Sequence, residues 1–188
     1  MPVLKIIRSR LLHAVFISAC MVLHLYAQPV VSREYQIKAV FIFNFTQFVD
    51  WPQTAFPDAD APLVIAVLGD NPFGSYLNET VAGEKINGHP VIVQYYNRTE
   101  EIQNCHILFI ALSDPQKSEQ VISGIKGKSI LTIGDSPDFL KRGGMIKFFK
   151  RKNNIRFEIN PAATKSASLT LSSKLLRVAE IFDPSKKS

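Results

Sequence analysis

A nearly continuous apolar run, LVIAVLG at residues 63–69, is the feature that most constrains the fold. A strand in which almost every residue is apolar must be covered on both faces of its sheet, as is typical of parallel sheets. Three further strands are predicted within residues 85–96, 106–112 and 129–135. Residues 113–127 carry the early proline and the final glycine of a helix. Strands that alternate with helices predict a mostly parallel sheet flanked by helices.

The segments on either side of these strands complete the predicted fold. Residues 32–51 contain no glycine or proline and predict a helix that ends before Pro52. The runs MIKFFK (145–150) and IRFEIN (155–160) predict an antiparallel hairpin, because the asparagines between them favour turn conformations. Residues 161–182 predict a last helix. We therefore expect an α/β fold in which a mostly parallel central sheet is flanked by helices and followed by a C-terminal antiparallel hairpin and a final helix.

The first 27 residues predict a cleavable secretory signal peptide rather than part of the domain. A basic start precedes the apolar run LLHAVFISACMVLHLYA, which ends on a small residue, Ala27. Residues 28–188 are expected to form a single domain, since 46% of the 188 residues are hydrophobic, which is enough to build a core. Two alternatives stay open: an uncleaved membrane anchor, and a lipoprotein in which Cys20 carries the lipid.

Export would change both the charge and the thiol content of the protein. Loss of the signal peptide removes Lys5, Arg8 and Arg10 and lowers the formal net charge from +6 to +3. An exported protein with this moderate charge is a poor partner for nucleic acid. Cys20 would leave with the signal peptide, so Cys105 would be the single remaining thiol and no intrachain disulfide could form.

No residue pattern predicts catalysis, a metal site or a cofactor. Cys105 and His106 are neighbours in a predicted strand, so their side chains point to opposite faces and cannot pair as nucleophile and base. His89 lies in a predicted turn, and two separated histidines with one cysteine do not have metal-ligand spacing. The protein is therefore expected not to be an enzyme. An exported hydrolase would need His89 or His106 to meet a nucleophile and an acid in one cleft.

The segment GDNPFG, at residues 69–74, follows a strand and precedes a predicted short helix, which is where phosphate-binding loops occur. Its spacing fits neither common phosphate-binding motif, and Asp70 would repel an anion. We interpret the segment first as a helix-capping turn and second as a ligand loop formed by Asp70, Asn71, Phe73 and Gly74. In the second interpretation the protein is a small-molecule binding module, with its ligand at the carboxyl ends of the strands.

Both terminal helices are predicted to be more apolar than one packing layer requires. The main apolar face of the first helix comprises Ile37, Val40, Phe41, Phe45, Phe48 and Trp51. Ile42 and Phe43 fall outside this face, and the last helix presents Leu171, Leu175 and Phe182. In one interpretation these five residues contact a second copy or a partner. In the other, both helices are packed between the sheet and neighbouring elements.

Eight blocks of sequence, in their order and spacing, resemble the YfiR-like family of bacterial periplasmic proteins. The blocks are spread over nearly the whole of residues 28–188 and read EYQIKAVFIFNFTQFVDWP, VLGDNPFG, INGHPVIV, CHILFIA, LTIGD, GGMIKF, FEIN and SSKLLRVA. The resemblance implies a periplasmic α/β domain that tends to form dimers. It also implies binding to the periplasmic sensor domain of an inner-membrane diguanylate cyclase, which is held inactive so that cyclic-di-GMP and biofilm formation stay low.

The resemblance supplies no catalytic residues, and it leaves the membrane partner open between a cyclase and a sensor kinase. This sequence also departs from the better-known family members. Those carry further cysteines and are proposed to respond to periplasmic oxidation through disulfides, whereas only Cys105 persists here after export. An intrachain redox switch is then excluded, and an intermolecular disulfide stays open.

Overall fold

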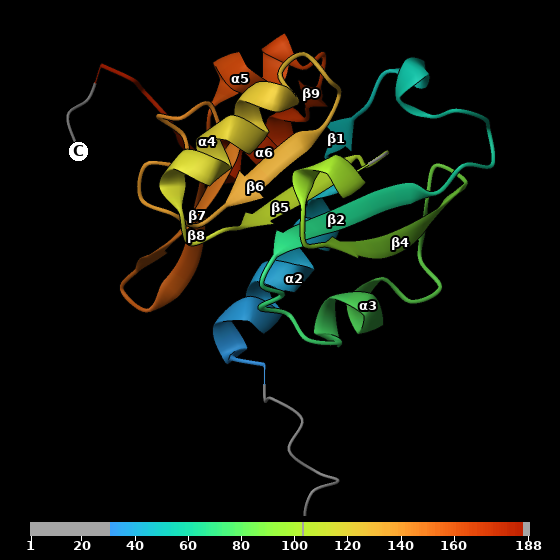
Figure 1. Cartoon of the computed structure of the whole chain (residues 1–188), viewed down its shortest axis with the longest axis horizontal. Coiled ribbons are helices and arrows are strands. Elements are labelled where there is room, and N and C mark those ends of the chain that lie inside the picture. The colour runs from blue at the N-terminus through green and yellow to red at the C-terminus, as the bar shows by residue number, and fades with distance from the viewer. Residues whose placement is uncertain (1–30, 103, 186–188) are drawn as a thin grey trace, which may run out of the picture. The chain divides into compact units, whose positions relative to one another are not determined.

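The described part of the chain, residues 31–102 and 104–185, is built around one eight-stranded sheet, seen in a computed structural model (Figure 1). The predicted signal peptide, with Cys20, lies outside the described residues. The strand order is β10-β8-β7-β6-β5-β2-β4-β3. The bounds of these strands, in chain order, are β2 (Leu63–Gly69), β3 (Lys85–Ile86), β4 (His89–Tyr96), β5 (Ile107–Ala111), β6 (Leu131–Gly134), β7 (Ile146–Arg151), β8 (Asn154–Ile159) and β10 (Glu180–Ile181).

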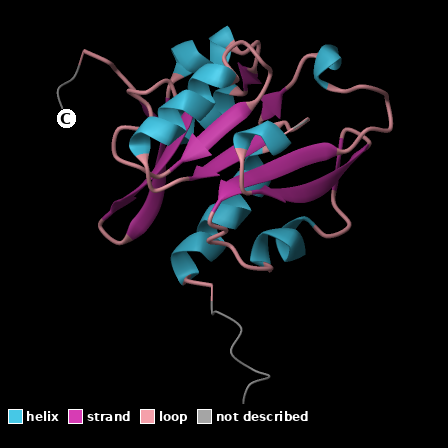
Figure 2. Ribbon diagram, viewed as in Figure 1, coloured by secondary structure: helices cyan, strands magenta, loops and turns pink. Residues whose placement is uncertain are grey.

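Five neighbouring strands, β4, β2, β5, β6 and β7, run parallel. Counted along the chain from β2, their spatial order is 2-1-3-4-5, which is one of the two common orders of doubly wound sheets. The hairpin strand β8 then pairs antiparallel with β7. The predicted α/β fold, with its mostly parallel sheet, C-terminal hairpin and final helix, is confirmed (Figure 2).

Helices cover both faces of the sheet, which explains the continuous apolar runs. On one side lie α2 (Arg33–Phe45) and α3 (Tyr76–Val81), and on the other lies α4 (Pro115–Gly124) (Figure 1). Alternate side chains of β2 enter two separate cores: Leu63, Ile65 and Val67 enter the one that contains α2, and Val64, Ala66 and Leu68 the other. Each strand residue is therefore buried whichever face it takes.

The first predicted helix, over residues 32–51, is too long. α2 ends at Phe45, and the chain then forms the short strand β1 (Val49–Asp50), which pairs antiparallel with β9 (Thr170–Leu171). The Thr46 hydroxyl donates a hydrogen bond to the Phe43 carbonyl at 2.6 Å, and Trp51 precedes a proline. Both features favour leaving the helix, the first by competing for a backbone carbonyl and the second by disfavouring helical angles.

The prediction of one continuous helix over residues 161–182 is wrong. The segment forms α5 (Pro161–Ser166), β9, α6 (Ser173–Val178) and β10, so the final helix is present as α6 but is short. Ser168 adopts a positive φ of 57°, which interrupts the helix, and the Ser172 hydroxyl accepts a hydrogen bond from the Leu175 amide to start α6. Two 3₁₀ turns, η1 (Gln53–Ala55) and η2 (Thr99–Glu101), complete the described elements. None of the described helices has the length and hydropathy needed to cross a membrane.

Candidate functional site

A charged cluster joins α2 to the carboxyl end of β6. The Lys38 ammonium lies 2.7 Å from a Glu34 oxygen and 2.7 Å from Asp135 Oδ2, and its side chain is only 3% exposed. The Tyr35 hydroxyl donates to the same Asp135 oxygen at 2.9 Å, and Lys150 pairs with Glu34 at 2.5 Å. We call these five residues the Lys38 cluster. Two cations balance two carboxylates, so the cluster fastens α2 to the sheet and leaves no uncompensated charge.

The pKa shifts in the Lys38 cluster follow from this pairing. Burial would raise the pKa of the Glu34 carboxyl, but hydrogen bonds from Lys150 and Lys38 outweigh it and lower that pKa overall. Burial and the neighbouring Asp135 carboxylate raise the pKa of the Tyr35 hydroxyl. Glu34 thus stays ionised and Tyr35 stays protonated at neutral pH, which preserves the hydrogen bonds.

The hollow beside the Lys38 cluster has a volume of about 560 Å³ and mixed charge. Lysine and carboxylate side chains line it together, namely Glu34, Lys38, Asp135, Asp138, Lys147 and Lys150. A charged ligand would meet attraction and repulsion at once, so this hollow offers weak selectivity for either sign of charge.

The sequence-predicted ligand loop is held mainly by its own hydrogen bonds. Asn71 Oδ1 accepts from the Phe73 amide at 2.9 Å, and Asn71 Nδ2 donates to the Gly74 carbonyl at 3.0 Å, whereas Asp70 is exposed. Phe73 is fully buried, with its ring 5.5 Å from Tyr35 and 4.9 Å from Phe109. The loop therefore acts as a turn anchored by Phe73, and its role in ligand binding stays a prediction.

Cys105 and His106 lie in different surroundings. Cys105 is 6% exposed and belongs to the core that contains α4. His106 is 2% exposed, accepts a hydrogen bond from the Val64 amide at Nδ1 (3.0 Å), and stacks on Phe56 with ring centres 4.2 Å apart. Phe56 also stacks on His89, at 4.0 Å. An aromatic ring thus separates the two histidines, and no group of three or more candidate metal ligands occurs among residues 31–102 and 104–185.

The five predicted partner-binding residues are not together on one surface. Ile42 is fully buried and Leu175 is 4% exposed, so both belong to the core and would reach a partner only if the domain opened. Phe43 and Leu171 are partly buried against the same core, and Phe182 against the core on the opposite face of the sheet. Reaching these positions from outside would disturb packing.

The apolar side chains that α2 exposes are not among the predicted partner-binding residues. Ile37 is 38% and Val40 is 41% exposed, although the sequence pattern placed them on the packed face. They lie three residues apart and therefore on one side of the helix, which we call the outer α2 face. Further exposed apolar side chains are Val178 and Ile181, near the C-terminus.

Comparison with known families adds the decisive observation: the model of the YfiR/HmsC-like family matches residues 35–180. The chain belongs to this family. The match runs from α2 into β10 and so includes both helical layers and nearly the whole sheet. No curated protein matches the chain. Membership in the YfiR/HmsC-like family supports a regulatory role in cyclic-di-GMP signalling.

The burial of Cys105 makes a prediction about redox behaviour in this YfiR/HmsC-like protein. Burial raises the pKa of its thiol to about 12, so little thiolate forms at neutral pH. We expect iodoacetamide to label Cys105 more than about a hundredfold more slowly in the native protein than in urea. Peptide mapping by mass spectrometry measures the rate at this residue alone. Rapid native labelling would instead show an accessible thiol and favour the intermolecular disulfide.

Proposed function

We propose that the protein is a periplasmic regulator that binds the periplasmic sensor domain of an inner-membrane signalling protein. The partner is most directly a diguanylate cyclase, which the bound regulator represses, so that cyclic-di-GMP and biofilm formation fall. The family match over residues 35–180 is the observation that carries this proposal. A membrane sensor kinase is the alternative partner. The protein also pairs with a second copy of itself in this proposal, as the resemblance implies.

The outer α2 face is the proposed contact surface. Ile37 and Val40 are exposed apolar residues on a helix that the Lys38 cluster fastens to the sheet. A rigidly held helix that presents apolar side chains loses little conformational freedom when it binds. Phe43 is partly exposed and flanks this surface. Ile42 and Leu175 are buried, so they do not belong to it.

Repression requires only that the bound regulator favour one state of its receptor. If the outer α2 face binds the inactive arrangement of the sensor domain more tightly than the active one, binding shifts the receptor population toward the inactive form. Coupling to the cytoplasmic enzyme then passes through the receptor's own membrane helices, and the regulator does no chemistry.

Replacing Val40 with glutamate tests the contact surface. Val40 is 41% exposed, so we expect the variant to remain folded and to lose more than about tenfold in affinity, because a charge must then be buried in the interface. The measurement is affinity capture from solubilised membranes of the host, with mass spectrometry of the retained proteins. Val178, which is 59% exposed on α6, provides a matched control through the same substitution.

The outcomes of this capture separate the candidate functions. Recovery of a membrane cyclase by the wild type and by Val178→Glu, with loss in Val40→Glu, supports the repressor and its surface. Equal recovery by both variants would overturn the outer α2 face as the contact. Recovery of no membrane signalling protein by folded wild-type protein would favour the second candidate, a periplasmic small-molecule binding module that serves another receptor. A cavity between α4 and α5 is the observation that favours this second candidate.

A further inference from the structure

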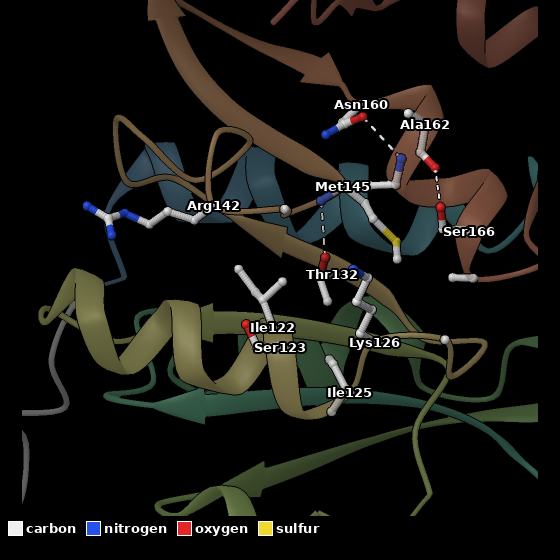
Figure 3. Close-up of a pocket in the computed structure, with 14 residues that line it drawn as sticks. Ile122, Ser123, Ile125, Lys126, Thr132, Arg142, Met145, Asn160, Ala162 and Ser166 are labelled. Carbon is white, nitrogen blue, oxygen red and sulfur yellow. Dashed lines mark hydrogen bonds between the residues drawn. The ribbon is translucent and has the colours of Figure 1, made fainter.

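A cavity of about 320 Å³ lies between α4 and α5 and shares no lining residue with the hollow beside the Lys38 cluster (Figure 3). Four segments of the sequence enclose it: the end of α4 with the turn after it, β6 at Thr132, the loop that precedes β7, and α5 with the residue before it. This volume is at the lower end of the range for small-molecule sites, so the cavity suits a ligand smaller than a typical drug.

The floor of the cavity is apolar. Ile122, Ile125 and Met145 each have at most 8% of their surface exposed, and Figure 3 shows their side chains converging on the hollow. Thr132 lies beside them and its hydroxyl oxygen accepts a hydrogen bond from the Met145 amide at 3.1 Å. An apolar ligand body would bind most favourably to this floor, since the contact removes hydrocarbon surface from water.

The polar groups of the α5 wall are already satisfied. Asn160 Oδ1 accepts from the Ala163 amide at 3.1 Å, and the Ser166 hydroxyl donates to the Ala162 carbonyl at 2.9 Å. These hydrogen bonds lie within or next to the first turns of α5 and are drawn in Figure 3. The wall therefore has little to offer a strongly polar ligand, and specificity must come from charge.

The charged side chains that line the cavity are both cationic. Its lining contains Lys126 and Arg142 and no acidic residue. Lys126 is exposed, forms no ion pair within the described ranges, and points toward the hollow in Figure 3. Arg142 lies at the other end, and its side chain points away from the other lining residues in Figure 3. Glu119 binds one of its nitrogens at 2.6 Å, and its buried Nε has no partner among the described residues. Because Glu119 already compensates Arg142, an anionic group on the ligand would meet unpaired positive charge at the Lys126 end.

We infer that this cavity binds a small amphipathic anion, a molecule with one carboxylate on a short apolar body. The body packs on Ile122, Ile125 and Met145, and the carboxylate meets the Lys126 ammonium at the rim. Both parts are needed, because an exposed ion pair alone contributes little and an apolar body alone would not use the cationic rim. This inference is independent of which membrane protein the regulator binds.

Octanoate is the probe for this site, with octylammonium as the probe of opposite charge and equal chain length. We expect titration followed by backbone amide NMR shifts to give saturable octanoate binding, with the shifts confined to α4, α5 and the loop before β7. Octylammonium should bind at least about fivefold more weakly, since its ammonium meets the Lys126 ammonium at the rim and no carboxylate in the lining. Equal binding of the two probes would overturn the inference, as would no saturation by octanoate below about 10 mM.

Two charge reversals provide the matched comparison. Lys126→Glu should weaken octanoate binding about fivefold, because it replaces attraction with repulsion at the rim. Lys128→Glu makes the same change in net charge two residues away, at an exposed side chain outside the cavity lining, and should leave the affinity unchanged. Both positions are exposed, so both variants should unfold at the wild-type urea concentration. Equal weakening by the two variants would show that only net charge matters and would overturn the site.

Discussion

Replacing Lys38 with alanine is expected to lower the free energy of unfolding by about 3 kcal/mol at neutral pH. The Lys38 side chain is 3% exposed, and its loss leaves the Glu34 and Asp135 carboxylates, 26% and 30% exposed, without the cation they share. Because water reaches both carboxylates, the cost should lie at the lower end of the range for broken buried ion pairs. The variant also loses the contact of the ammonium with the Tyr35 ring, 4.2 Å from its centre. Urea unfolding followed by circular dichroism measures the change.

Lys150 provides the control for this prediction. It pairs with Glu34 in the same cluster, but its side chain is 57% exposed, so Lys150→Ala should cost less than about 1 kcal/mol. The two variants remove the same kind of charge from the same cluster and differ in burial. A cost for Lys38→Ala as small as that for Lys150→Ala would mean that the cluster does not fasten α2 to the sheet.

The sheet could be predicted from the sequence because its signal is local. In β2, every position from Leu63 to Leu68 is apolar and buried, since two cores receive alternate side chains. Such a run does not fit a sheet with one face exposed to solvent, so the run alone indicates a sheet that is covered on both faces. The hairpin of β7 and β8 was also predictable, because asparagine tolerates the positive φ angle that Asn153 adopts. The second turn residue was expected to be Asn154 but is Lys152, since Asn154 already belongs to β8.

The buried side of α2 could not be predicted, because the helix is apolar almost all round. Periodicity placed Val40 on the packed face and Ile42 outside it, whereas the structure buries Ile42 and exposes Val40. The contact between Lys38 and Asp135, which lie 97 residues apart, fixes how α2 is turned about its own axis. The periodicity of the helix sequence contains no information about this contact. The sequence did contain one indication of this contact, because Lys38 lies within an otherwise apolar stretch, four residues after Glu34.

The C-terminal segment was misassigned because distant pairing overrides its helical pattern. β9 pairs with β1 through Leu171 and Val49, and β10 pairs with β8 through Ile181 and Ile159. These partners are non-local, so a short window of sequence does not contain them. The cavity between α4 and α5 was missed for the same reason: four separate segments of the sequence line it, and none of them carries a motif.

Acid is expected to destabilise the protein through His106, by about 2 kcal/mol between pH 7 and pH 4.5. Burial lowers the pKa of His106 to about 4, the Ala55 backbone opposes this shift, and His89, across the Phe56 ring, adds to it. The unfolded chain takes up a proton near pH 6.5, whereas the folded chain does so only near pH 4. Between these values the unfolded state holds more protons, so stability falls as the pH falls.

The structural reason is the hydrogen bond from the Val64 amide to His106 Nδ1, 3.0 Å long, which requires an unprotonated nitrogen. Protonation turns that acceptor into a donor facing another donor, at the junction of β2 and β5. The measurement is urea unfolding at pH 7, 6, 5 and 4.5. Carboxylates of lowered pKa such as Glu34 begin to lose their contribution only near pH 5, so the change from pH 7 to pH 5 reports mainly on His106. His106→Phe keeps a ring against Phe56 and should be less stable at pH 7, because the Val64 amide loses its acceptor, yet its stability should depend much less on pH. If both proteins lost the same stability toward pH 4.5, the acid response would have to come from groups other than His106.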